Sequence, residues 1–119
     1  MLIDEFRDYC LSKNGVSESM PFDQHTLVFK VGSKMFALAS LNGIPLRINL
    51  KCLPDRAVNL REEHPEIVLP GYHMNKTHWN TVVVDGTMAQ LWYRELIDHS
   101  YELVLKSLTR KERLTLDLP

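Results

Sequence analysis

The chain has 119 residues, of which 45% are hydrophobic and 24% are charged, as is typical of one soluble globular domain with its own core. Its apolar runs are far shorter than the ~20 residues of a membrane span, and no basic-then-apolar leader opens the sequence. The formal net charge of −1 excludes a uniformly basic nucleic-acid binder, so any such surface has to be local. We therefore expect a single cytoplasmic domain, residues 1–119, without membrane contact.

The N-terminal segment 2–13 has the pattern of an amphipathic helix. Its apolar positions recur at the spacing of one helix face: Leu2, Phe6, Tyr9 and Cys10. Asn14-Gly15 follows and is a good helix stop, because both residues tolerate left-handed backbone angles. Cys10 and Cys52 belong to no C-x-x-C pair, so we expect both to be reduced and buried.

A β region comes next. Residues 26–31 and 34–41 are predicted strands joined by a hairpin turn at Gly32-Ser33, and a second turn at Asn42-Gly43 leads into a third strand, 44–51. Alternation in the third strand directs side chains to opposite faces: Ile44, Leu46, Ile48 and Leu50 to a core, and Arg47, Asn49 and Lys51 to solvent. The sequence therefore predicts an antiparallel meander with one apolar face and one basic, polar face.

Helices and one more strand are expected in the second half. Residues 54–64 form a short helix that begins with proline, where the missing N–H does no harm. Segment 65–71 is expected to be a loop or an irregular edge, and the apolar run 81–84 a strand. A long amphipathic helix covers 88–108, after which Thr109 caps a last short helix.

The order of these elements indicates an α+β fold. We expect one twisted antiparallel sheet of four or five strands, with the N- and C-terminal helices packed on one of its faces.

Four segments in this order resemble the MmcQ/YjbR family of small bacterial proteins: KMFALASL (34–41), LRINLKCLPDRAVNL (46–60), GYHMNKTHWNTVVVDG (71–86) and DHSYELV (98–104). The H-M-N-K-x-H-W-N-T and S-Y-E-L-V pieces carry most of the resemblance, which extends over nearly the whole chain. It implies a fold like that of the bacterial frataxins (CyaY-like), with two helices on a twisted antiparallel sheet. Members of the family are commonly labelled DNA-binding proteins.

Metal binding and catalysis find little support in the residues. His73 and His78 are five positions apart, which points them away from each other on a helix and to opposite faces on a strand. His99 and Ser100 are adjacent on a predicted helix and face different directions, without the strand–turn–helix elbow of a nucleophile. We expect no metal, no cofactor and no enzyme activity.

Nucleic-acid binding is the first functional hypothesis. The hairpin turns at 32–34 and 42–43, with Lys30, Lys34, Arg47 and Lys51 nearby, resemble two wings that could contact a phosphate backbone with little base specificity. The 71–80 loop adds polar candidates: Asn75, Lys76, His78, and Trp79 for stacking.

A structural interpretation of the same loop is equally open. In it, Trp79 is core, His73 and Asn75 satisfy loop main-chain groups, and Lys76 only keeps the sheet edge soluble. The second functional hypothesis is a protein-interaction or small-ligand module, whose ligand lies in a groove by residues 71–80. In either case we expect a monomer, with DNA as the possible partner of the first hypothesis.

Overall fold

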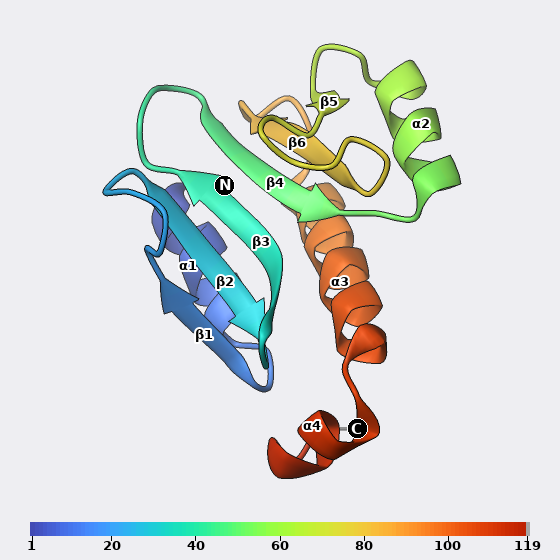
Figure 1. The fold of residues 1–119 in the computed structure, drawn as a ribbon. Helices are drawn as coiled ribbons and strands as arrows, with labels where there is room; N and C mark the ends of the chain where they lie inside the picture. Colours follow the sequence, from blue (N-terminus) through green and yellow to red (C-terminus); the bar gives the residue numbers. More distant parts are fainter. Residues whose placement is uncertain (119) are drawn as a thin grey trace.

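The fold, a computed structural model that describes residues 1–118, is a six-stranded antiparallel sheet with four helices (Figure 1). The spatial order of the strands is β1-β2-β3-β4-β6-β5. The strands are β1 (Val16–Ser19), β2 (Thr26–Val31), β3 (Lys34–Ser40), β4 (Leu46–Lys51), β5 (Val68–Pro70) and β6 (Trp79–Val84). The helices are α1 (Ile3–Leu11), α2 (Pro54–Glu63), α3 (Gln90–Ser107) and α4 (Arg110–Thr115). The predicted α+β class is confirmed.

The sheet has six strands instead of the expected four or five, because β1 and β5 were not predicted as strands. Both lie at the edges of the sheet and are only 4 and 3 residues long. Segments this short become strands by pairing with a longer neighbour. Three or four residues are too few for an alternating apolar pattern to predict a strand from the sequence. Pro70 is tolerated at the end of β5 because an edge strand leaves some N–H positions unpaired.

The two predicted turns of the meander differ in outcome. Gly32 adopts φ +58° in a tight β2–β3 turn, which is the glycine conformation that the hairpin signal requires. The second turn was expected at Asn42-Gly43 alone, but β3 ends at Ser40 and β4 begins at Leu46. The connection therefore has five residues, 41–45, and Ile44 is fully exposed instead of facing the core.

Helices α1 and α3 cover one face of the sheet, as predicted (Figure 1). Phe6 of α1 packs edge-on against Phe29 of β2, with ring centroids 5.5 Å apart, and Tyr101 of α3 packs in the same way against Phe36 of β3. Cys10 lies in this core with no solvent exposure, and burial raises the pKa of its thiol to about 12. Both cysteines are free and buried, which confirms the prediction.

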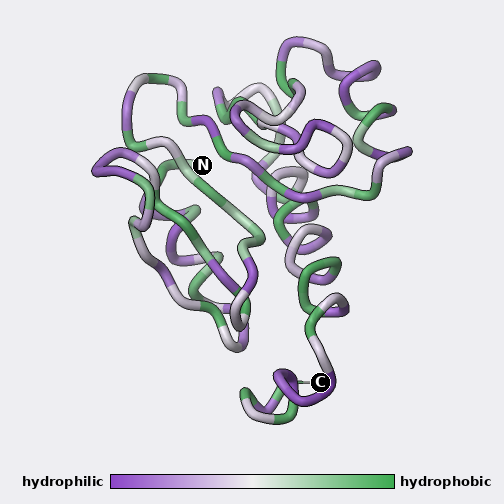
Figure 2. The backbone as a smooth tube through the Cα atoms, viewed as in Figure 1, coloured by the Kyte–Doolittle hydropathy of each residue, from purple (hydrophilic) through white to green (hydrophobic). Residues whose placement is uncertain are grey.

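A second, smaller cluster lies on the opposite, outer face. Val28, Leu38 and Trp79 are buried there, and Met35 and Met74 pack against them. Figure 2 shows apolar residues along β2 and β3, in the middle of the sheet, and mainly hydrophilic residues in the loop after β5. The outer face is therefore partly apolar, not only basic and polar as the alternation in β4 indicated.

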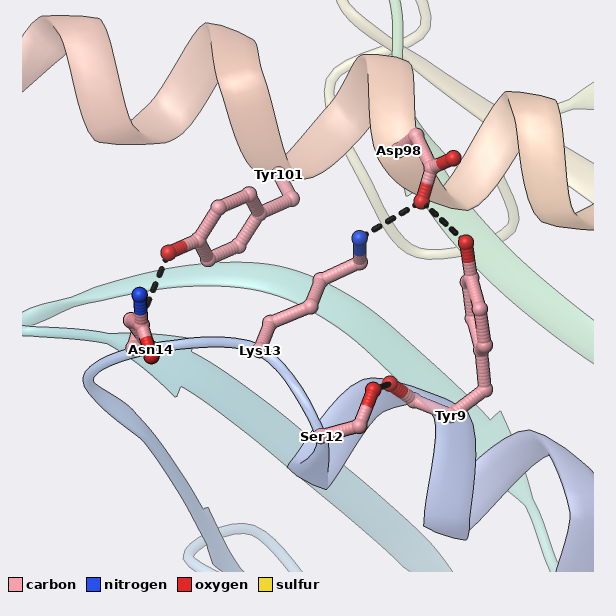
Figure 3. A network of polar contacts seen from close by, with 6 residues as sticks. All are labelled: Tyr9, Ser12, Lys13, Asn14, Asp98 and Tyr101. Carbon is pink, nitrogen blue, oxygen red and sulfur yellow. Dashed lines mark hydrogen bonds and ion pairs between the residues drawn. The ribbon is translucent and has the colours of Figure 1, made fainter.

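A polar network fixes the end of α1 to α3 (Figure 3). The Tyr9 hydroxyl donates to Asp98 at 2.6 Å, and the Lys13 ammonium forms an ion pair with the same carboxylate. The Tyr101 hydroxyl donates to the main-chain oxygen of Asn14 at 2.6 Å. Burial, then the hydrogen bond to Asp98, raises the pKa of Tyr9 to about 12, which extends the pH range over which this hydroxyl is a donor. Tyr101 in the S-Y-E-L-V segment thus has a structural role.

Candidate nucleic-acid interface

Three basic side chains share the outer face of the sheet. Lys30 is paired in register with Met35, and Lys51 with Trp79, and both partners belong to the outer cluster. Side chains at alternate positions of a strand point to the same face, so Arg47 lies on the same side as Lys51. We call these three residues, Lys30, Arg47 and Lys51, the basic face.

The basic face is compact. Lys30 and Lys51 are separated by one strand, so strand spacing alone places their main chains about 10 Å apart. Arg47 lies four positions before Lys51 on β4, which is about 13 Å along the strand. The span from Lys30 to Arg47 is then about 16 Å, so the three charges together extend over about five nucleotides of a nucleic-acid strand, at ~3.4 Å of rise per nucleotide.

No carboxylate of the six described strands neutralises these charges. Glu18 is the one acidic strand residue, and it accepts two hydrogen bonds from the guanidinium of Arg7 in α1. Glu18 is paired with Phe29, whose ring lies in the core under α1, so its side chain belongs to the helix-covered face. Within residues 1–118 no member of the basic face forms an ion pair. The positive charge of this face is therefore uncompensated by its own sheet.

Lys34, which the sequence placed with these cations, lies elsewhere. It is paired with Val31, a residue of the helix-side core, and its ammonium donates to the main-chain oxygen of Ser107 at 2.9 Å. The predicted wing at residues 32–34 is also not free. The Ser33 amide donates to the Glu112 carboxylate of α4 at 2.7 Å, so an acidic side chain occupies this turn.

The 71–78 loop is held by its own polar groups. The Asn75 carboxamide oxygen accepts from the Thr77 amide at 2.9 Å, and the Asn75 main-chain oxygen accepts from the Trp79 amide at 2.9 Å. The Lys76 ammonium donates to the main-chain oxygen of Gly71 at 3.1 Å, which closes the loop. Asn75 therefore satisfies loop main-chain groups, as the structural interpretation expected, whereas Lys76 closes the loop instead of only keeping the sheet edge soluble.

Helix α2 supports the loop from the side. The Arg61 guanidinium donates to the Asn80 carboxamide oxygen at 2.7 Å and to the main-chain oxygen of Lys76 at 3.4 Å. The Asn80 amide group in turn donates to the main-chain oxygen of Ala57 at 3.4 Å. Asn80 is buried, and these two contacts satisfy both ends of its carboxamide.

Trp79 and His78 have different surroundings. The Trp79 side chain is only 8% exposed and packs in the outer cluster, so the stacking role considered for it is excluded by burial. The main-chain oxygen of His78 accepts a hydrogen bond from the Cys52 amide at 2.8 Å, and His78 is exposed to solvent. Of the loop residues proposed from the sequence, His78 alone presents a side chain to solvent without a described hydrogen bond.

Tyr72 was not singled out from the sequence, although it belongs to the same motif. Its side chain is 70% exposed, and its ring centroid lies 4.0 Å from that of His73. The Tyr72 amide donates to the Thr81 hydroxyl at 2.9 Å, and that hydroxyl donates to the Asn49 carboxamide. Sequence patterns alone do not distinguish this exposed aromatic from the buried Trp79.

The side chains of His99 and Ser100 form hydrogen bonds with main-chain groups. The Leu53 amide donates to Nε2 of His99 at 3.3 Å. The Ser100 hydroxyl is fully buried, donates to the main-chain oxygen of Phe36 and accepts from the Lys51 amide at 2.8 Å. Neither side chain is available for nucleophilic chemistry, because the lone pair or proton it would need is already engaged.

The environment of His99 predicts a pH dependence of stability. Burial, then the nearby Arg56 charge, lowers the pKa of His99 below its ordinary value of 6.5. His99 therefore binds a proton more readily in the unfolded chain than in the folded one. The free energy of unfolding is at its full value above about pH 6.5, the ordinary pKa, and decreases as the pH falls from there toward the lowered pKa of the folded state. We expect the melting temperature to fall from about pH 7.5 to about pH 5.5, and to fall less in His99→Gln, which keeps an acceptor that does not titrate. Equal losses in both proteins, measured by circular dichroism, would contradict this assignment.

Two hollows bear on the ligand hypothesis, which requires a groove by residues 71–80. The larger, of about 460 Å³, is at the end of the sheet where Leu46 pairs with Val84, and is lined mainly by residues 1–3, the 41–45 connection and residues 84–86. The smaller, of about 10 Å³, lies between α2, α3 and the sheet. Of residues 71–80, only Asn80 lines either hollow, and the hollow it lines has room for no more than about one water molecule, so neither is the groove that the ligand hypothesis requires.

The described residues contain no group of three or more His, Cys, Asp or Glu side chains that could hold a metal ion. No helix in the range 1–118 combines the length and the apolar character that crossing a membrane requires.

Comparison with known proteins places this arrangement in a family. The YjbR family model matches residues 11–103. The chain is 34% identical over 115 residues to the protein YjbR of Escherichia coli K12, covering 95% of each, and 39% identical over 94 residues to YbdF of Escherichia coli O157:H7, covering 78% of this chain and 75% of YbdF.

Two crystal structures are similar as well. The Deinococcus radiodurans protein DR2400 aligns with a TM-score of 0.92 and 44% identity, over 98% of this chain and 88% of its own. A Pseudomonas syringae protein aligns with a TM-score of 0.71 and 28% identity, over 87% of this chain and 99% of its own. The family match and the extent of these alignments show that the chain belongs to the YjbR family.

Proposed function

We propose that this protein binds DNA through the phosphate backbone, with little sequence specificity, using the outer face of the sheet. The single observation that carries the proposal is the basic face: three cations whose main chains lie within about 16 Å of one another, on strands that place no carboxylate beside them. Phosphate contacts need positive charge and impose no base preference, which agrees with a surface whose functional groups are mainly cations.

The proposal includes one hairpin connection and excludes the other. The β2–β3 turn is occupied by Glu112 of α4, and an acidic side chain there would repel a phosphate. The exposed 41–45 connection, which precedes Arg47, carries no acidic residue. His78 is a further candidate contact, because its exposed side chain lies one position before Trp79, the partner of Lys51 in the register.

Titration of a labelled duplex at low salt tests the proposal. Each neutralised phosphate releases counterions, so affinity should fall linearly with salt on logarithmic axes. We expect Lys51→Glu to weaken binding about tenfold and to reduce the salt slope by about one. The Lys51 amide, which donates to Ser100, is a main-chain group, and the substitution leaves it in place.

Lys111→Glu is the matched control, because Lys111 is an exposed cation of α4, outside the sheet, and the substitution changes the charge equally. Equal effects of the two substitutions would mean that net charge, not the basic face, determines the affinity. Absence of binding to both duplex and single-stranded DNA by the unmodified protein at low salt would refute the proposal.

We further propose that the protein acts as a cytoplasmic monomer without enzyme activity, metal or cofactor. The likeness to bacterial frataxins that the sequence resemblance implies stays a prediction, which superposition on a frataxin structure would test.

A further inference from the structure

The motif 71–80 holds two aromatic side chains with opposite environments. Trp79 is buried in the outer cluster, whereas Tyr72, seven positions earlier, is 70% exposed. Leaving a tyrosine ring in water forgoes the gain of burying it, and an exposed aromatic beside a charged face often serves recognition. The Tyr72 ring is not isolated, since the His73 ring lies beside it at 4.0 Å between centroids, with the two ring planes inclined by 51°.

The main chain that carries this aromatic pair is closely attached to the sheet. The Gly71 amide donates to the main-chain oxygen of Trp79 at 3.0 Å, and a Cβ atom at Gly71 would lie 2.8 Å from that oxygen. Only glycine allows this approach without a shift of the backbone. At the next position the Tyr72 amide donates to the Thr81 hydroxyl. His73 follows with φ 58°, a left-handed angle uncommon outside glycine.

These attachments place the aromatic pair beside the basic face. The Thr81 hydroxyl that holds Tyr72 also donates to Asn49, its register partner on β4. Asn49 lies between Arg47 and Lys51 in sequence, and alternation directs all three side chains to the outer face. The main chain of Tyr72 therefore lies over the outer face, within about one or two strand spacings of ~4.8 Å from two of the three cations.

We propose that Tyr72 and His73 form a stacking platform for an unpaired base, and that the preferred ligand is single-stranded DNA whose backbone crosses the basic face. The inference rests on the proposed function and specifies its substrate class. A duplex hides the faces of its bases in its own stack, so an exposed ring beside phosphate-binding cations gains contact area only from unpaired bases. Stacking on a tyrosine tolerates any base, which agrees with low sequence specificity.

Fluorescence anisotropy on two ligands tests the inference: an oligothymidine of about 20 nucleotides, a length beyond one binding site, and a duplex of equal length. We expect the oligothymidine to bind more tightly than the duplex at equal salt. Tyr72→Ala should weaken binding of the oligothymidine about tenfold and change duplex binding little. Tyr72→Phe, which keeps the ring, should retain the affinity.

Phe22→Ala is the matched control, because Phe22 is 62% exposed in the β1–β2 connection, next to the opposite edge strand of the sheet. It should leave both affinities unchanged. If the duplex binds at least as tightly as the single strand, or if Tyr72→Ala acts equally on both ligands or on neither, the inference is wrong. Sensitivity of duplex binding to Lys51→Glu would then preserve the proposed function. If neither ligand binds at low salt, the proposed function fails as well.

Discussion

Trp79→Ala is expected to lower the free energy of unfolding by about 3–5 kcal/mol. Trp79 is the largest member of the outer cluster, and among residues 1–118 the other side chains buried in it are Val28 and Leu38. A core of this size has few neighbours that could collapse into the space left by an indole ring. Met74, which packs on the cluster from the 71–78 loop, would also lose its support.

Urea denaturation followed by circular dichroism measures this change. Tyr72→Ala is the internal control, since an exposed aromatic of the same motif should change the free energy of unfolding by no more than about 0.5 kcal/mol. A loss below about 1 kcal/mol in Trp79→Ala would show that the outer cluster contributes little and that the motif is not primarily structural.

Ser100→Ala is expected to be the second large effect, with a loss of about 2–6 kcal/mol in the free energy of unfolding. The register between β3 and β4 ends at the pair Ala37 and Leu50. Just beyond this pair the Ser100 hydroxyl joins the two strands, because it donates to the Phe36 main-chain oxygen and accepts from the Lys51 amide. Its removal leaves one buried acceptor and one main-chain donor without their partner, at about 1–3 kcal/mol each.

Amide hydrogen exchange gives this prediction a local readout. The Lys51 amide should exchange faster in Ser100→Ala, while amides in the middle of β2 change only with global stability. Ser12→Ala removes an exposed hydroxyl that donates to the main-chain oxygen of Tyr9, and should cost little (Figure 3). Unchanged protection at Lys51 would contradict the proposed role of Ser100 even if the protein were destabilised.

Local patterns were sufficient for the longer elements of the fold. Alternation in β4 correctly separated Arg47 and Lys51 from Ile48 and Leu50, because the two-residue period of a strand is a property of the backbone itself. The predicted cap of the last helix is also confirmed, since the Thr109 hydroxyl accepts from the Glu112 amide. The edge strands β1 and β5 were missed because their pairing partners, not their own residues, make them strands.

The composition of the candidate site required the tertiary structure. Lys30 and Lys34 flank the same turn, yet Lys34 pairs with Val31 and Lys30 with Met35, and successive pairs of a ladder direct their side chains to opposite faces. Only the packed structure shows that the Lys34 ammonium is also engaged, by the Ser107 main-chain oxygen at the end of α3. Trp79 is buried because the pairing of its strand with β4 places its side chain on the same face as Val28 and Leu38, against which it packs. Tyr72 is exposed because its loop turns back after Gly71.

By itself, then, the sequence determined the fold class, the long elements and the side of β4 that carries its cations. Which cations meet on one face, and which aromatic of the motif faces solvent, was decided only by the packing of segments that are distant in the chain. The physical reason is range: helix and strand periodicity arise from neighbouring residues, whereas burial and charge clustering depend on contacts across the sheet.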